Sequence, residues 1–93
     1  MNTQHKTENL TIHHKVKDYA AWRTAYDGHE KSRVSAGITN GRVFRSAEDP
    51  NDVLILLDVA DETQARAWLG EDDLKATMHK AGVVGSPSFR FAA

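Results

Sequence analysis

One histidine in this sequence lies where an apolar side chain is expected. Residues 10 to 16 alternate between apolar and polar types, as in a half-buried strand, and His14 takes a place on the apolar side. Its imidazole changes charge near neutral pH, so it is suited to act as a general base on a bound small molecule. The alternative is a core histidine bonded to Tyr26 or to the backbone, because buried polar groups need partners in either case.

A second candidate feature is a stripe of side chains that all carry a polar group. They recur at spacings of three and four, which is the spacing of one helix face: Tyr19, Trp22, Tyr26, His29 and Arg33. We expect Trp22 to wall a pocket for a planar ligand, and Tyr26 and His29 to orient the ligand, with His29 a second catalytic candidate beside His14. Taken singly, Trp22 and Tyr26 are better explained as core packing, so their value is collective.

Arg45 is the candidate for binding an anionic group, because a guanidinium pairs well with a carboxylate or a phenolate. It follows Phe44 on a short expected strand, so the two side chains point to opposite faces. On the helix-covered face, Arg45 would belong to the ligand site. On the other face, it would belong to a dimer interface, and the alternation is consistent with both.

Motifs for metal and cofactor chemistry are missing from this sequence. It contains no cysteine, which excludes thiolate catalysis and zinc–thiolate sites. His13 and His14 are neighbours on a strand and point to opposite faces, so they cannot bind one ion. A pair of His14 and His29 would lack a third ligand, and no glycine-rich phosphate-binding fingerprint occurs. We therefore expect no metal and no cofactor.

The elements that would position these residues follow the order β-α-β-β-α-β. Strands are expected over residues 10 to 16, 41 to 46, 53 to 59 and 89 to 91. Between them, one helix is expected from a cap at Asp18 to a glycine stop at Gly37, and two helical stretches are expected after Asp61 and Asp72. This order predicts an α+β, ferredoxin-like fold, with an antiparallel sheet and the helices on one face.

The third expected strand, residues 53 to 59, has apolar side chains on both faces. Its alternating sets are Val53, Ile55, Leu57 and Val59 on one side and Leu54 and Leu56 on the other. The helices of one small domain can cover only one face of a sheet. We therefore expect the other face to pack against a second copy of the chain, giving a homodimer.

Length and charge narrow the class of protein. The 93 residues suffice for a single domain, expected over residues 9 to 93 after a flexible leader of residues 1 to 8. Twelve basic residues against 13 acidic ones give a net charge of −1, so we expect no binding to nucleic acid or to membranes. No apolar run resembles a signal peptide or a membrane span, and a cytoplasmic location is expected.

Three segments carry a resemblance to a known group of proteins: residues 16 to 22 (VKDYAAW), 42 to 51 (RVFRSAEDPN) and 81 to 87 (AGVVGSP). They resemble small bacterial proteins of the dimeric α+β barrel superfamily, of the cyclase-like and antibiotic biosynthesis monooxygenase-like kinds. The resemblance covers the chain from residue 9 onward and implies a pocket between helices and sheet in each subunit. The monooxygenases of the superfamily act on polycyclic phenols without metal or flavin. Where many members end the third strand with Glu-x-Trp, this chain has Asp58-Val59-Ala60.

Together, the residues and the resemblance predict a cofactor-independent enzyme of the monooxygenase or cyclase type, with an aromatic or polyketide-like substrate. His14 would be the general base. One alternative is a homodimer that binds a small molecule without catalysis. Another is a haem-binding relative, because haem-degrading members use a tryptophan and a histidine from a region comparable to Trp68 and His79. In that case His29 or His79 would be the axial ligand, although packing for Trp68 and a solvated position for His79 are simpler expectations.

Overall fold

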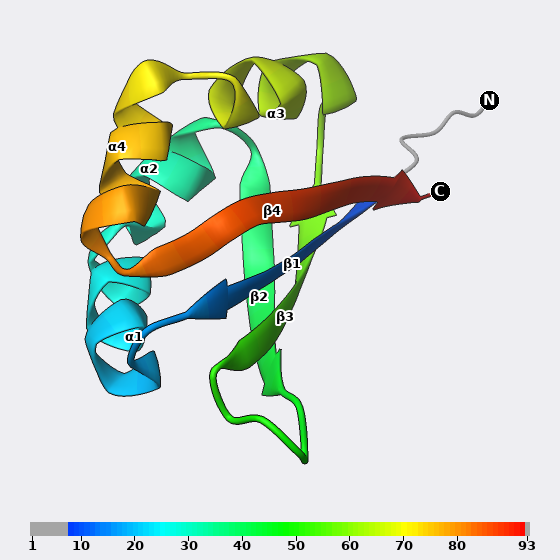
Figure 1. The fold of residues 1–93 in the computed structure, drawn as a ribbon. Coiled ribbons are helices and arrows are strands. Elements are labelled where there is room, and N and C mark those ends of the chain that lie inside the picture. Colours follow the sequence, from blue (N-terminus) through cyan, green and yellow to red (C-terminus); the bar gives the residue numbers. More distant parts are fainter. Residues whose placement is uncertain (1–7, 93) are drawn as a thin grey trace, which may run out of the picture.

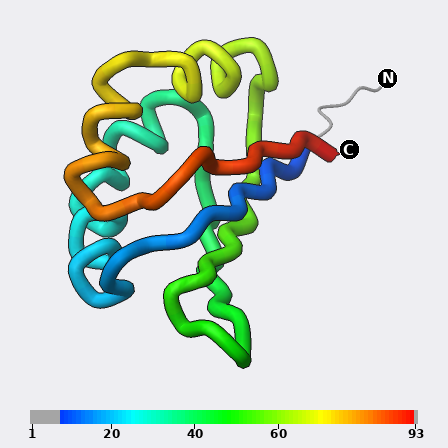
Figure 2. The backbone as a smooth tube through the Cα atoms, in the orientation of Figure 1, coloured from blue at the N-terminus to red at the C-terminus, as the bar shows by residue number. Residues whose placement is uncertain are grey.

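The computed structural model describes residues 8 to 92, and within them the chain forms one layer of strands and one layer of helices (Figures 1 and 2). The strands are β1 (Glu8–Val16), β2 (Ile38–Arg45), β3 (Asp52–Val59) and β4 (Val83–Ala92). The helices are α1 (Tyr19–Gly28), α2 (Glu30–Ser35), α3 (Glu62–Leu69) and α4 (Asp72–Lys80). The predicted leader lies outside the described residues, apart from Glu8, which already belongs to β1.

The sheet has the strand order β2-β3-β1-β4, and every pair of neighbours is antiparallel. The first and third strands of the chain thus lie in the middle, and the second and fourth form the edges. This arrangement confirms the predicted α+β, ferredoxin-like fold. None of the helices in residues 8 to 92 is long and apolar enough to cross a membrane.

The hydrophobic core lies between the helices and one face of the sheet, which we call the helix-covered face. Its most deeply buried large side chains come mainly from the two central strands: Leu10, Ile38, Val53, Leu57 and Val59. Burial alternates residue by residue along β3, as its sequence pattern predicts. Full burial of one such side chain stabilises the fold by about 1.5–3 kcal/mol, so this face supplies much of the driving force for folding.

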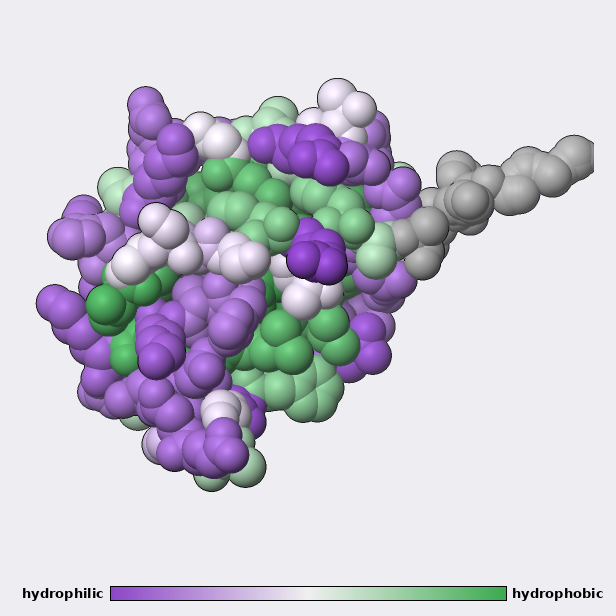
Figure 3. Space-filling model, turned by 45° about the vertical axis from the view of Figure 1, so that its right-hand side comes forward, coloured by the Kyte–Doolittle hydropathy of each residue, from purple (hydrophilic) through white to green (hydrophobic). Residues whose placement is uncertain are grey.

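The opposite face of the sheet, which we call the outward face, carries a smaller apolar surface. Leu54 and Leu56 are only partly buried there, and Phe44, paired with Leu54 on the neighbouring strand, is 48% exposed. Val84 of β4 is also exposed. Figure 3 shows several apolar areas on the face that it presents, with polar side chains between and around them.

The expected single helix over residues 19 to 36 is in fact two helices, and this prediction was wrong. α1 ends at Gly28, and His29 has φ −99° and ψ 10°, outside the helical region, before α2 begins. Glycine weakens a helix interior. Arg33 then stabilises the break, because its Nη1 donates to the carbonyl oxygen of Tyr26 at 2.7 Å, near the end of α1. The stop itself is as expected, with Gly37 at φ 76°.

The last strand is longer than the sequence pattern predicts. Residues 83 to 87 read as a loop because they contain Gly85 and Pro87, yet β4 begins at Val83. An edge strand tolerates proline, since one side of its backbone needs no ladder partner. The pairing of β1 with β4 also shifts register between His13 and Lys15, which accommodates the irregular stretch.

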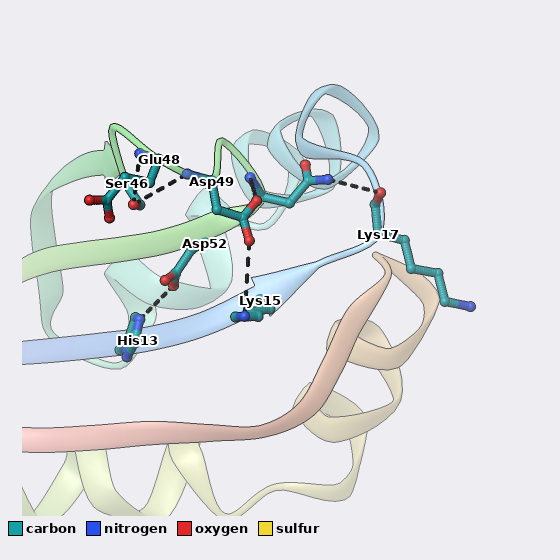
Figure 4. A network of polar contacts seen from close by, with 8 residues as sticks. His13, Lys15, Lys17, Ser46, Glu48, Asp49 and Asp52 are labelled. Atoms are coloured by element: carbon teal, nitrogen blue, oxygen red, sulfur yellow. Dashed lines mark hydrogen bonds and ion pairs between the residues drawn. The ribbon is translucent and has the colours of Figure 1, made fainter.

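A network of polar contacts joins the β2–β3 loop to β1 and to the start of α1 (Figure 4). Asn51 is its central residue: its Oδ1 accepts from the backbone N–H of Tyr19 at 3.2 Å, and its Nδ2 donates to the carbonyl oxygen of Lys17 at 3.4 Å. Asp18 caps α1 by accepting from the N–H of Ala20. The loop and the cap together fix where α1 begins.

Candidate functional site

A cavity of about 60 Å³ lies between the helices and the helix-covered face of the sheet. Every strand except β2 and all four described helices contribute to its wall, which is mostly apolar. Four of the five side chains that the sequence singles out as a site line this one cavity: His14, Trp22, Tyr26 and His29. The fold therefore brings together residues that are up to 15 positions apart in the chain.

His14 is buried in the wall of the cavity, with 6% of its surface exposed. Its ring meets that of Trp22 edge to face, at a centroid distance of 5.5 Å. The buried Nδ1 has no hydrogen-bond partner among residues 8 to 92. Burial lowers the pKa of the imidazole below its usual value, so the ring is neutral at pH 7. A neutral imidazole can accept a proton.

The three aromatic rings of α1 are in contact one after another, and the last two of them, Trp22 and Tyr26, line the cavity. Trp22 and Tyr26 have centroids 5.0 Å apart and nearly parallel rings, and Tyr19 follows Trp22 at 5.8 Å. A guanidinium contacts each end: that of Arg33 lies 3.7 Å from the centre of the Tyr26 ring, and that of Arg45 lies 3.7 Å from the centre of Tyr19. Cation–π contacts of this kind hold the rings in place.

The hydroxyl group of Tyr26 is also buried without a hydrogen-bond partner in the described part of the chain. It lies against the backbone of Gly41 in β2, where a Cβ atom would come within 2.2 Å of the hydroxyl oxygen. Only glycine permits this close approach. Burial raises the pKa of Tyr26, so the group remains a neutral donor at physiological pH.

Arg33 is the site residue that the sequence did not single out. It lines the cavity and is 8% exposed, and no Asp or Glu among residues 8 to 92 forms an ion pair with it. Burial lowers its pKa from the usual value, but an arginine keeps its charge in a protein. The one sign of it in the sequence was its position at the end of the helix stripe of polar and aromatic side chains.

Arg45 lies on the helix-covered side of β2, because it pairs with Val53 of β3, yet it does not line the cavity. Its guanidinium stacks on Tyr19, and its Nε donates to the carbonyl oxygen of Pro50 at 2.9 Å. Both contacts hold the hairpin against the start of α1. A role for Arg45 in binding a ligand stays a prediction.

His29 and Trp68 form a second stack, with centroids 6.0 Å apart. The indole N–H of Trp68 donates to the hydroxyl of Ser32 at 2.9 Å, which ties α3 to α2 and fits the expected packing role. His79 is exposed, as expected. A cavity of about 60 Å³ is far too small for a haem, so the residues as arranged do not fit that group.

The described residues hold no cluster of metal ligands. No group of three His, Asp or Glu side chains there is placed to bind one metal ion. The cavity instead offers a neutral base, a fixed positive charge and aromatic walls, while the hydroxyl of Tyr26 lies against Gly41 of β2, outside the cavity wall. Such a set can orient a planar molecule, take a proton from it and stabilise the negative charge that remains.

Comparisons with known proteins address the fold. No family model matches this chain, and no curated protein is similar to it in sequence. Several solved structures are similar. One, a protein from Bordetella bronchiseptica named as a candidate antibiotic biosynthesis monooxygenase, has a TM-score of 0.76 at 13% identity, covering 95% of this chain and 97% of that one.

Two further structures have the same fold. SnoaB, a cofactor-independent oxygenase from Streptomyces nogalater, has a TM-score of 0.72 at 10% identity, covering 94% of this chain and 91% of SnoaB. A conserved protein from Methanosarcina mazei Go1 has a TM-score of 0.70 at 12% identity, with coverages of 94% and 91%. The chain therefore has the α+β fold of the antibiotic biosynthesis monooxygenase-like proteins, as its three sequence segments predict.

Proposed function

We propose that this protein is a cofactor-independent enzyme of the monooxygenase or cyclase type that acts on a small aromatic compound. The observation that carries the proposal is the buried, neutral His14, which lines a cavity with aromatic walls and whose Nδ1 has no partner in the described chain. An unpaired buried nitrogen costs stability, and a substrate proton would supply the missing partner. The likeness of the fold to SnoaB, a cofactor-independent oxygenase, supports the same class of reaction.

In the proposed reaction, His14 takes a proton from a phenol or from an acidic C–H beside it. Trp22 stacks on the ring, while Tyr26 and His29 orient it. The resulting anion is electron-rich enough to react with dioxygen directly. One oxygen atom enters the substrate and the other leaves as water, and the substrate itself supplies all four electrons. The protein contributes positioning, proton transfer and electrostatic stabilisation.

The cavity must widen to admit such a substrate. At about 60 Å³ it is smaller than the cavity of roughly 150 Å³ that holds benzene in another protein. Two apolar wall side chains that are not fully buried are Met78 of α4 and Phe89 of β4, which is 37% exposed. Since methionine is flexible, movement of these two side chains is the simplest way to open the cavity.

The same proposal includes a homodimer formed through the outward face. Support comes from the exposed Phe44 and Val84 and the partly buried Leu54 and Leu56, which lie on strands whose other face is already packed. A second copy would cover this apolar surface and add to the modest stability that a chain of 93 residues can reach alone.

A non-catalytic ligand-binding protein is the competing function, favoured by the small cavity and by Asp58-Val59-Ala60 at the end of β3. Turnover of anthrone, followed by oxygen uptake and by quinone absorbance, separates the two. We expect the wild type to be active and His14→Leu to lose at least about a hundredfold in rate. The melting temperature should stay equal or rise, because leucine removes an unpaired polar group.

The matched control is His79→Leu, which changes an exposed histidine on α4 and should keep full activity. A His14→Leu variant with wild-type turnover would contradict the proposed role of His14. An inactive wild type that still binds anthrone would favour the non-catalytic function.

A further inference from the structure

Arg33 is a buried charge that forms no ion pair with any carboxylate of the described chain, and this sets it apart from the other arginines there. Three of them form ion pairs with carboxylates: Arg23 with Asp27, Arg42 with Asp58 and Arg66 with Glu62. Arg45 and Arg90 form none, but both are exposed to water. Buried charges are normally paired, because removing them from water is costly. Arg33 bears this cost with a single hydrogen bond and one aromatic stack.

The guanidinium of Arg33 also has unused donors. It carries five N–H groups, and among residues 8 to 92 only Nη1 has a hydrogen-bond acceptor, the carbonyl oxygen of Tyr26. Stacking on the Tyr26 ring fixes the plane of the group. A fixed fork with free donors is the geometry that binds a carboxylate or another oxyanion.

Arg33 lies at a partition between two hollows. It lines the inner cavity, where it is the one permanently charged residue among the described wall residues, and together with Tyr26 it also lines an outer groove of about 360 Å³ beside β2. That volume falls in the range of small-molecule pockets. A ligand in either hollow, or across both, meets the same positive charge.

The remaining charged residues of the outer groove form no ion pair with Arg33, although the carboxylates of Glu30 and Asp27 attract it from a distance. Arg23 and Asp27 neutralise each other, with Nε and Oδ1 3.0 Å apart. Glu30 also lines the groove, but its side chain is exposed, so water and salt screen it. Asn40 adds a neutral polar side chain.

From these observations we propose that Arg33 is the anion-binding residue of this site, and that the ligand is a planar aromatic compound with an ionised oxygen, a carboxylate or a phenolate. This inference rests on the proposed function, because it names the substrate class of the same site. In that reaction Arg33 would stabilise the anion that His14 creates or would hold a carboxylate that the substrate already carries.

The test compares two probes with one shape and different charge, a naphthoate and the matching naphthamide, titrated into the wild-type protein by calorimetry. We expect the naphthoate to bind at least about tenfold more tightly, as for hydrogen bonds to a charged group. Arg33→Gln should abolish this preference, whereas Arg33→Lys should retain part of it. Equal affinity of the wild type for the two probes would overturn the inference.

The control variant is Arg23→Gln, which removes an exposed, ion-paired arginine from the same groove and should leave the preference unchanged. If Arg23→Gln loses the preference for the naphthoate and Arg33→Gln keeps it, then Arg23 binds the anion and our assignment is wrong. The wild-type comparison keeps the test valid even if Arg33→Gln fails to fold, and Arg33→Lys keeps a positive charge and N–H donors at this position.

A third probe, a naphthol, separates the two sources of the anion. If the naphthol binds more tightly as the pH rises through its own pKa, the natural ligand is a phenolate. If the naphthol binds weakly at every pH while the naphthoate binds tightly, the natural ligand is a carboxylate. The inference and the proposed function can fail separately. Turnover of anthrone without any preference for the naphthoate refutes only the role of Arg33, and a clear preference without turnover refutes only the proposed catalysis.

Discussion

His13 and His14 are neighbours in the chain, yet they lie in opposite environments. The side chain of His13 is 54% exposed on the outward face, with its Nε2 2.5 Å from Oδ1 of Asp52 (Figure 4). His14 is almost fully buried on the helix-covered face, and its Nδ1 has no partner in the described chain. The comparison teaches that the strand position, and not the residue type, decides which histidine can act as a base.

The largest expected effect is on stability, and it compares a leucine on the helix-covered face with one on the outward face. Leu57→Ala on the helix-covered face should lower the free energy of unfolding by about 2–5 kcal/mol, because it leaves a cavity in the core. Leu54→Ala on the outward face should cost only about 1 kcal/mol in a separated subunit. Urea unfolding at two protein concentrations measures both effects.

The same experiment sharpens the dimer proposal. If the outward face is an interface, the stability of the wild type rises with protein concentration, and Leu54→Ala weakens that dependence. A Leu54→Ala variant that loses as much stability as Leu57→Ala at low concentration would break the distinction between the faces.

An intermediate effect concerns the pH dependence of stability. The unfolded chain protonates His14 near the ordinary pKa of 6.5, whereas burial lowers the pKa in the folded chain. Unfolding therefore takes up a proton below that pH, and the protein loses stability as the pH falls through 6.5 and beyond. Thermal unfolding from pH 8 to pH 5 should show a shallower fall of the melting temperature for His14→Leu than for the wild type. Identical slopes would mean that His14 is not protonated on unfolding in this range.

The smallest expected effect is on the outward face. Asp52→Asn removes the partner of His13, but both groups are in contact with water, so the free energy of unfolding should change by about 1 kcal/mol or less. Chemical denaturation at low and high salt measures the change. A loss comparable to that of Leu57→Ala would show that this ion pair is a structural element and not a surface contact.

Patterns within one element made much of the fold predictable. The alternation along β3 predicted which of its side chains face the helices and which face outward. Asp18 and Asp61 were recognisable as helix caps, because aspartate at such a position accepts from N–H groups two or three residues ahead, as both do here. Four cavity residues were predictable for the same reason: strand and helix periodicities assign His14, Trp22, Tyr26 and His29 to facing surfaces. Their roles in binding or catalysis stay predictions.

Features that depend on contacts between elements were not predictable. The break at His29 is stabilised by Arg33 reaching back seven residues, and the side of Arg45 is set by its pairing with Val53 in another strand. The length of β4 depends on β1, which supplies the partners for a segment that alone looks like a loop. Arg33 itself was visible in the stripe, but its lack of a carboxylate partner is a property of the assembled fold.

The bonds of Asn51 to Lys17 and Tyr19 have a consequence for how the chain tolerates insertions. Because successive residues of an α-helix are turned by about 100° around its axis, starting α1 one residue earlier or later would swing Trp22 and Tyr26 away from the cavity. The β2–β3 loop thus fixes the rotation of α1 about its axis, through hydrogen bonds at the start of that helix alone. Changes in its length should alter ligand selectivity from a distance, even where every wall residue is retained.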